Sequence, residues 1–130
     1  SASLPSDHQY VASAEYYLGE SLLGQGKLFD AEAVLTASMN RWKRTDAPLW
    51  RVARSKNALG EVLYRQGRIV EAEQALVSTF QALAADEGAD LDAKERAKER
   101  VARFYTQRGQ AAKFAQLERE VADHVAQVSP

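Results

Sequence analysis

The sequence predicts an all-α fold built from repeated pairs of helices, and three observations carry this prediction. The chain has 130 residues, of which 45% are apolar and 27% charged, a composition typical of a chain that folds. Only three prolines and seven glycines interrupt it, and its apolar residues recur at steps of three and four, never in strict alternation. The third observation is an internal repeat. We therefore expect six stacked helices and no strand.

The repeat is clearest when residues 19–35 are set above residues 60–76. Both stretches carry glycine, leucine, Gln-Gly, a basic residue, an acidic residue, Ala-Glu and leucine at equal offsets. The glycines of the two Gln-Gly pairs are Gly26 and Gly67, so the register shift, 67 − 26, is 41 residues. A weaker third copy contains Gly109, shifted by 109 − 67, or 42. A period of this size indicates stacked supersecondary units.

Each unit is predicted to form two helices joined at one of these glycines. A glycine at this corner can adopt the left-handed conformation that closes a helix. Apolar residues at helical spacing lie on both sides of each corner. The expected helices are 6–25, 28–44, 48–66, 69–86, 91–108 and 111–128, so the three repeats of this single domain span 6–44, 48–86 and 91–128. Residues 1–5 are expected to be a linker or a leftover terminal segment.

Capping residues mark the starts of three of these helices. Ser6 or Asp7 can cap the first helix, just after Pro5. Thr45 or Asp46 can cap the third helix, with Pro48 in its first turn, where a missing amide does no harm. Asp90 or Asp92 can cap the fifth helix, because an Asp side chain accepts hydrogen bonds from the first free amides of a helix.

Large and small residues alternate at fixed places in the first two units. They are Leu18-Gly19, Leu22, Gly26, Ala31 and Leu35, and then Leu59-Gly60, Leu63, Gly67, Ala72 and Leu76. This pattern resembles the tetratricopeptide repeat. The long period is similar to the extended repeats of kinesin light chains and of C-terminal regions of bacterial regulatory proteins, including some serine/threonine kinases. The resemblance implies a right-handed superhelical stack of three helix-turn-helix units that binds other proteins and performs no catalysis.

The third copy departs from this pattern. Ala102 replaces the glycine that lies inside the first helix of the other units, Phe114 occupies the alanine place and Glu118 the large-residue place. A terminal unit faces water on one side and acts as a cap, so we expect such divergence there.

The residue types give little sign of catalysis, of a metal or of a cofactor. The chain has no cysteine, which excludes disulfides and thiolate catalysis and removes the commonest zinc ligand. Its two histidines, His8 and His124, lie near opposite ends of the sequence and form no cluster of metal ligands. Acidic pairs are mixed with basic residues along the same helices, which indicates solvated faces. We expect no enzyme and no cofactor.

Charge and hydropathy bear on the remaining partner classes. The formal charge of −1 gives no overall attraction to nucleic acid or acidic lipid, and no apolar run is long enough to span a membrane. Arg96, Arg100 and Arg103 share one face of the fifth helix, which makes nucleic-acid binding a remote alternative. Glu95 and Glu99 are interleaved with them, so a salt-bridged face or the wall of a peptide groove is favoured. The lack of cysteine fits the cytoplasm and leaves the periplasm open.

The family resemblance implies a binding groove on the inside of the curved stack, lined by the first helix of each unit. Its positions step by three and four along each helix, as one helical face requires. The side chains at these positions include phenols, an amide, hydroxyls and charges of both signs, and such a surface suits an extended peptide or a partner helix. Carried over residue by residue, these positions are Ser13, Tyr16, Glu20, Leu23, Arg54, Asn57, Glu61, Tyr64, Arg96, Glu99, Arg103 and Thr106.

Two other functions stay open at the level of sequence. The open ends of such an array can pair with a second copy, and Tyr10, Tyr16 and Tyr17 make a self-association surface plausible. The domain could also dock on, and regulate, an enzyme domain of the same protein, such as a kinase. Trp42 and Trp50 flank the link between units one and two, where wedging the units together is favoured over anchoring a ligand.

Overall fold

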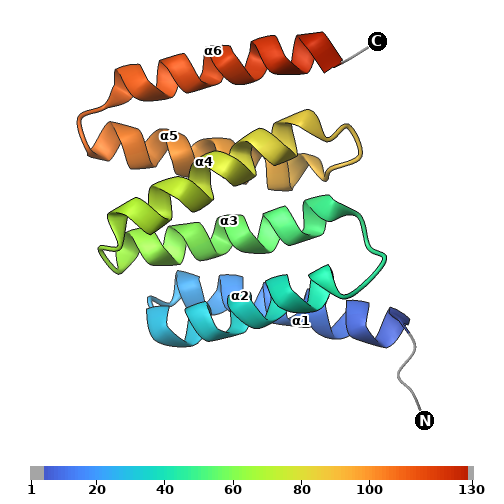
Figure 1. Cartoon of the computed structure of the whole chain (residues 1–130). Helices are drawn as coiled ribbons and strands as arrows, with labels where there is room; N and C mark the ends of the chain where they lie inside the picture. The colour runs from blue at the N-terminus through green and yellow to red at the C-terminus, as the bar shows by residue number, and fades with distance from the viewer. Residues whose placement is uncertain (1–4, 129–130) are drawn as a thin grey trace.

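The computed structural model describes residues 5–128, with side chains from residue 8 onward, and within this range it contains six helices and no strand (Figure 1). Every expected helix is confirmed, with ends within one residue of the prediction. Of the expected linker, residues 1–4 lie outside the described range, and Pro5 begins the first helix. The helices are α1 (Pro5–Gly24), α2 (Leu28–Lys43), α3 (Leu49–Arg65), α4 (Ile69–Ala85), α5 (Leu91–Gln107) and α6 (Ala111–Val128).

The helices stack as three pairs in chain order, from the α1–α2 pair, which runs from blue to cyan, to the red end of α6 in Figure 1. Each of the first two pairs packs closely within itself, and the second helix of each packs on the first helix of the next pair. The first helices, α1, α3 and α5, also contact one another in sequence order. This arrangement places residues of all three units along one face of the stack.

The glycine corners have the predicted conformation. Gly26, Gly67 and Gly109 have φ values of +75°, +80° and +69°, and they are the positive φ angles of the described chain. After Gly67, the amide of Arg68 donates to the carbonyl of Leu63 at 2.9 Å, as in a Schellman motif. The same bond pattern recurs at the other two corners. The repeat therefore reflects a shared way of ending the first helix of each unit.

One of the three predicted caps is confirmed and two are wrong. Helix α1 begins at Pro5, so Ser6 and Asp7 lie inside it and neither is its N-cap. Asp90 is the N-cap of α5, and its side chain accepts from the amide of Ala93 at 3.2 Å. At α3, the N-cap is Pro48, with no side-chain cap bond. The hydroxyl of Thr45 instead donates to the carbonyl of Trp42 at 2.8 Å, which ties it to the end of α2. Local side-chain bonds of this kind compete with capping of the following helix.

Small residues let the paired helices approach closely. A Cβ placed on Gly60 would lie 3.0 Å from Cδ2 of Leu76, and one on Gly19 would be closer still to Leu35, its equivalent one repeat earlier. The buried core forms two clusters that each span two units, and the half-buried Leu59 packs against both. In the first, Ala58 and Val62 of α3 pack with Leu35 of α2. No unit therefore has a separate core of its own.

The third pair is more open than the others. Helix α6 packs less closely on α5 than α2 does on α1, and the buried side chains that it contributes are Leu117 and Val121. Phe114, which stands in the alanine place, is half-buried and tilted against Phe80 with ring centroids 6.5 Å apart. A phenyl ring at the place of a methyl group holds the two helices apart, which accounts for the looser packing.

Candidate binding channel

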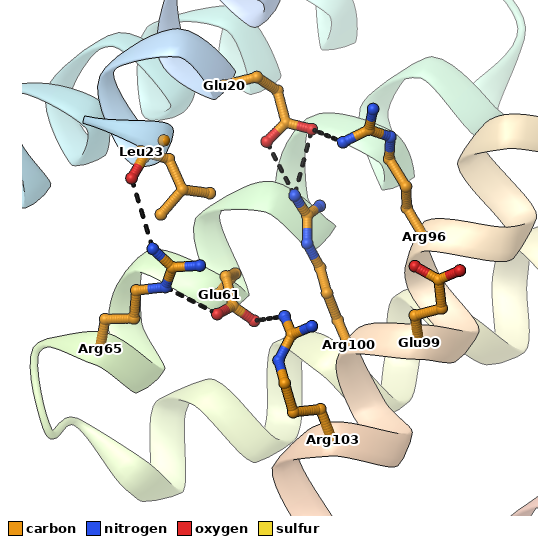
Figure 2. Close-up of a pocket in the computed structure, with 9 residues that line it drawn as sticks. Glu20, Leu23, Glu61, Arg65, Arg96, Glu99, Arg100 and Arg103 are labelled. Atoms are coloured by element: carbon orange, nitrogen blue, oxygen red, sulfur yellow. Dashed lines mark hydrogen bonds and ion pairs between the residues drawn. The ribbon is translucent and has the colours of Figure 1, made fainter. Parts of the chain in front are cut away.

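A channel of about 260 Å³ lies where α1, α3 and α5 meet, and Figure 2 shows the side chains around it. Four arginines and three glutamates dominate its wall, so its formal charge is slightly positive. They come from all three units, and the most distant two, Glu20 and Arg103, are 103 − 20, or 83, residues apart in sequence. The lining residues are Glu20, Leu23, Gly24, Glu61, Arg65, Arg96, Glu99, Arg100 and Arg103.

Glu20 of α1 is the centre of the upper part of the channel. Its carboxylate accepts from Arg100 at 2.8 Å and 3.2 Å and from Arg96 at 3.4 Å, both of which lie on α5. The hydroxyl of Tyr16 also donates to it, at 3.0 Å. Burial, followed by the charge of Glu20, raises the pKa of Tyr16 well above its ordinary value. The phenol therefore stays protonated and remains a donor.

A buried polar chain continues from this cluster into the stack. The second terminal nitrogen of Arg100, Nη1, donates to Oδ1 of Asn57 at 3.0 Å. The amide nitrogen of Asn57 in turn donates to the hydroxyl of Thr79 at 2.8 Å, so the chain joins α1, α5, α3 and α4. Asn57 and Thr79 are each 2% exposed. Both hydrogen-bonding ends of the Asn57 side chain are occupied within the protein, which leaves it no free amide group for a ligand.

Glu61 of α3 is the centre of the lower part of the channel. It stands one repeat after Glu20, and its side chain is 3% exposed. Arg65 donates to it at 2.9 Å and Arg103 at 3.1 Å. Arg65 also reaches the carbonyl of Leu23 in α1, at 3.4 Å. Each of the first two repeats thus presents a carboxylate that is held by arginines, and the third repeat ends the row by placing Arg103 itself at this position.

Solvent reaches the outer ends of this network. The side chains of Arg65, Arg96 and Arg103 are 45%, 49% and 43% exposed. Glu99 is exposed and has no ion-pair partner among the side chains that the structure describes. The channel wall therefore presents three arginines that are each paired with a glutamate and partly exposed to solvent, together with one unpaired carboxylate, Glu99.

A smaller cavity of about 100 Å³ adjoins the channel, with Tyr16, Tyr17 and Arg54 among its lining residues. The guanidinium carbon of Arg54 lies 4.0 Å from the ring centroid of Tyr16 and 5.2 Å from that of Trp50. Arg54 is 7% exposed, and its Nε and Nη2 have no hydrogen-bond partner in the described part of the chain. Stacking on two aromatic faces holds the buried charge in place.

The structure brings together half of the twelve groove residues predicted from the sequence. Ser13, Tyr64 and Thr106 lie on the same three helices without lining the channel, and Tyr64 donates to the side chain of Gln107 at 2.6 Å. Tyr16 and Arg54 line the adjoining cavity, whereas Asn57 is buried beneath Arg100. Those lining the channel itself are Glu20, Leu23, Glu61, Arg96, Glu99 and Arg103.

Sequence reasoning missed Arg65 and Arg100 as members of the channel. The repeat register places Arg100 at the position of Ala58, which packs against the preceding unit. An arginine there is long enough to pass the packed backbone and reach Glu20. The spacing of Arg96, Arg100 and Arg103 was a usable signal, because these three side chains share a helical face.

The basic side chains of α5 are mostly paired within the protein. Lys98 contacts Glu118 at 3.0 Å, Arg96 contacts Asp92 at 2.9 Å, and Arg103 is held by Glu61. On the face that Arg96 and Arg103 share with Arg100, all three arginines thus form ion pairs with glutamates of α1 or α3. At the first inter-unit link, Trp42 is 2% exposed, and Arg51 of α3 lies over both its ring and that of Trp50.

Two kinds of feature are absent from the described residues. Within residues 5–128 no group of three or more His, Cys, Asp or Glu side chains is placed to hold a metal ion. No helix in this range has the length and apolar character required to cross a membrane.

Comparison with known proteins identifies the architecture. The family model of the tetratricopeptide repeat matches residues 10–85, more than half of the chain. The matched stretch corresponds to the first two units, and the divergent third unit lies beyond it. No curated protein and no solved structure matches the sequence. With six stacked helices, glycine corners at the repeat period and this match, the chain belongs to the tetratricopeptide repeat family.

Proposed function

We propose that the channel between α1, α3 and α5 binds a segment of a partner protein, in the extended or helical form, and that the domain serves as a scaffold or regulatory part of a larger protein. Repeats of this family generally mediate protein–protein interaction. The observation that carries the proposal is the convergence of polar side chains from all three units on one channel, with Arg65, Arg96 and Arg103 half-exposed.

The chemistry of the wall favours a segment that carries both signs of charge. An acidic side chain of the partner would meet the outer faces of Arg96 and Arg103, whose inner faces already contact Glu20 and Glu61. A basic side chain would meet Glu99, which is exposed and unpaired in the described chain. Charged groups at such a rim set specificity and association rate more than raw affinity. The partner is therefore expected to bind with an affinity that falls as salt increases.

A library of random peptides displayed on phage tests this proposal and requires no candidate partner. The selected peptides are synthesised, and their affinity is measured for the parent and for the double variant Arg96→Ser, Glu99→Ser. This variant removes one charge of each sign from the channel and leaves Glu20 paired with Arg100. We expect a loss of affinity of about tenfold or more.

The matched control is Glu95→Ser, Arg119→Ser, which also removes one exposed charge of each sign but lies outside the channel. It should bind the peptides as the parent does. Equal affinity of the parent and both variants would place peptide binding elsewhere on the molecule. Failure to select any peptide would count against a groove that accepts short segments.

A further inference from the structure

The outer face of α1 carries a concentration of exposed apolar side chains. Nine large hydrophobic residues are exposed in the described chain, and four of them lie on this one helix. Tyr10 and Tyr17 are 75% and 62% exposed, and Val11 and Leu18 are 44% and 51% exposed. These side chains form two rows at a spacing of seven residues, with Ala14 between them, so they share one helical face. A contiguous apolar patch of this kind marks an interaction surface.

The repeat shows which residues of α3 and α5 are equivalent to this face of α1. One period later, the corresponding positions of α3 pack against the pair of helices that precedes them, and those of α5 do the same. In α1 the same positions have no helix against them among residues 5–128, since α1 packs only on α2 and α3 there. Ala14, Tyr17 and Ser21 correspond to Ser55, Ala58 and Val62, which are each 0% exposed. The face is thus built as a helix–helix interface.

The charged residues of α1 between Tyr10 and Ser21 form ion pairs with other helices. Between Tyr10 and Ser21 the helix has two charged residues, Glu15 and Glu20. Glu15 accepts from Arg41 of α2 at 2.8 Å, and Glu20 is held by Arg100 of α5. Covering the face therefore buries no charged group of this stretch, which removes the main cost of forming an interface.

We propose that a second copy of this chain covers the face, with the two α1 helices antiparallel and a two-fold axis at Ala14. In that arrangement Tyr10 of one copy faces Leu18 of the other, Val11 faces Tyr17, and the two Ala14 methyl groups meet at the crossing. Each aromatic ring thus lies against an aliphatic side chain, and the small residue at the axis lets the helices approach closely. The pattern is self-complementary, as a two-fold interface requires.

None of the four apolar side chains lines the channel itself, although Tyr17 also lines the smaller cavity beside it. The expected strength of the interface is modest. One helix pair buries less than the roughly 800 Å² per partner of a standard protein–protein interface. The dimer is therefore expected to form in the micromolar range or above. In sedimentation equilibrium the mass should rise from 14.4 kDa toward twice that value as concentration increases. The variant Tyr17→Lys, Leu18→Lys should stay monomeric, because it places charges inside the interface.

The matched control is Phe29→Lys, Val70→Lys, which alters two apolar residues that are each 81% exposed but lie outside this face. It should dimerise as the parent does. The axis is tested by cross-linking: because the chain has no cysteine, Ala14→Cys introduces a single thiol. A short bismaleimide should join two copies of Ala14→Cys in high yield and leave Ala33→Cys, exposed on α2, largely monomeric.

Three results would overturn the proposal. The first is a mass that stays at one copy over the whole concentration range. The second is a mass that grows past two copies, which indicates a head-to-tail array and not a closed two-fold pair. The third is a dimer whose cross-linking yield is the same for Ala14→Cys and Ala33→Cys, since such a dimer does not use α1 at its centre.

Discussion

Arg100 in α5 donates from Nη2 to both carboxylate oxygens of Glu20 in α1, at 2.8 Å and 3.2 Å, across 80 residues of sequence. Their side chains are 9% and 15% exposed, so water weakens the pair little. The pair joins α1 of the first unit directly to α5 of the third, although α3 of the second unit lies between them in the stack. In a repeat array most contacts join neighbouring units, and this contact is therefore a constraint on the curvature of the whole stack.

Removal of either partner should destabilise the fold. We expect Glu20→Gln to lower the free energy of unfolding by about 1.5–3 kcal/mol, because it leaves the buried guanidinium of Arg100 without its counter-charge. Arg96→Gln, at a side chain that is 49% exposed, should cost less than about 1 kcal/mol. Urea unfolding of Glu20→Gln, Arg100→Gln and the double variant measures the coupling. Strictly additive effects would mean that the two side chains do not stabilise each other.

Gly60 and Gly24 should respond in opposite ways to a side chain. A Cβ on Gly60 would lie 3.0 Å from Cδ2 of Leu76 and 3.2 Å from Cβ of Ala75, so Gly60→Leu should cost about 3 kcal/mol by overpacking. Nothing lies within 4 Å of a Cβ on Gly24, the last residue of α1. Gly24→Ala should therefore leave stability unchanged or raise it by up to about 1 kcal/mol. Thermal melts monitored by circular dichroism test both, and a Gly60→Leu protein that melted like the parent would contradict the close packing.

The helices and their corners were predictable because their signals are local. Apolar residues at steps of three and four set the helices, and Gly67 with φ of +80° illustrates a turn that favours glycine whatever surrounds it. The capping residue of α3 was predicted wrongly, since the Thr45 hydroxyl bonds backward to the end of α2 and the N-cap is Pro48. That choice depends on how two helices meet, which a short stretch of sequence does not encode.

The wall of the channel was predictable in part. Repeat register places Glu20 and Glu61 on equivalent helical faces, and both do line the channel. It cannot show how far a long side chain reaches, and for that reason Arg100 was not among the predicted groove positions, although its shared helical face with Arg96 and Arg103 was recognised. The burial of Asn57 could not be predicted from the sequence either, because it depends on Arg100, which comes from another unit and donates to the Asn57 side chain.

Alkaline pH should unfold the protein through Tyr16. Burial, with the charge of Glu20, raises the pKa of this phenol above its ordinary value of 10.0. Because the folded pKa lies above the unfolded one, the associated stability is complete below the unfolded value and is lost as pH rises above it. The free energy of unfolding should therefore fall as pH rises above about 10, and it should fall less in Tyr16→Phe. An identical pH dependence of the two proteins would show that Tyr16 ionises in the folded state without penalty.

Helix α6 should be the least protected part of the stack. It contributes two buried residues, Leu117 and Val121, whereas α3 contributes eight. Phe114 at the alanine place also holds it off α5, so fewer apolar contacts oppose its local opening. Backbone amides in the middle of α6 should exchange with solvent about tenfold or more faster than those in the middle of α3.

Native-state hydrogen exchange measured by mass spectrometry checks this order, with the middle of α4 as a second reference inside the stack. Units at the end of an array have one stabilising interface where internal units have two, so the expected order follows from position as well as from sequence. Equal protection of α6 and α3 at all denaturant concentrations would mean that the stack opens only as a whole. The substitution of Phe114 for the usual alanine would then be a change in packing that leaves the cooperativity of the array intact.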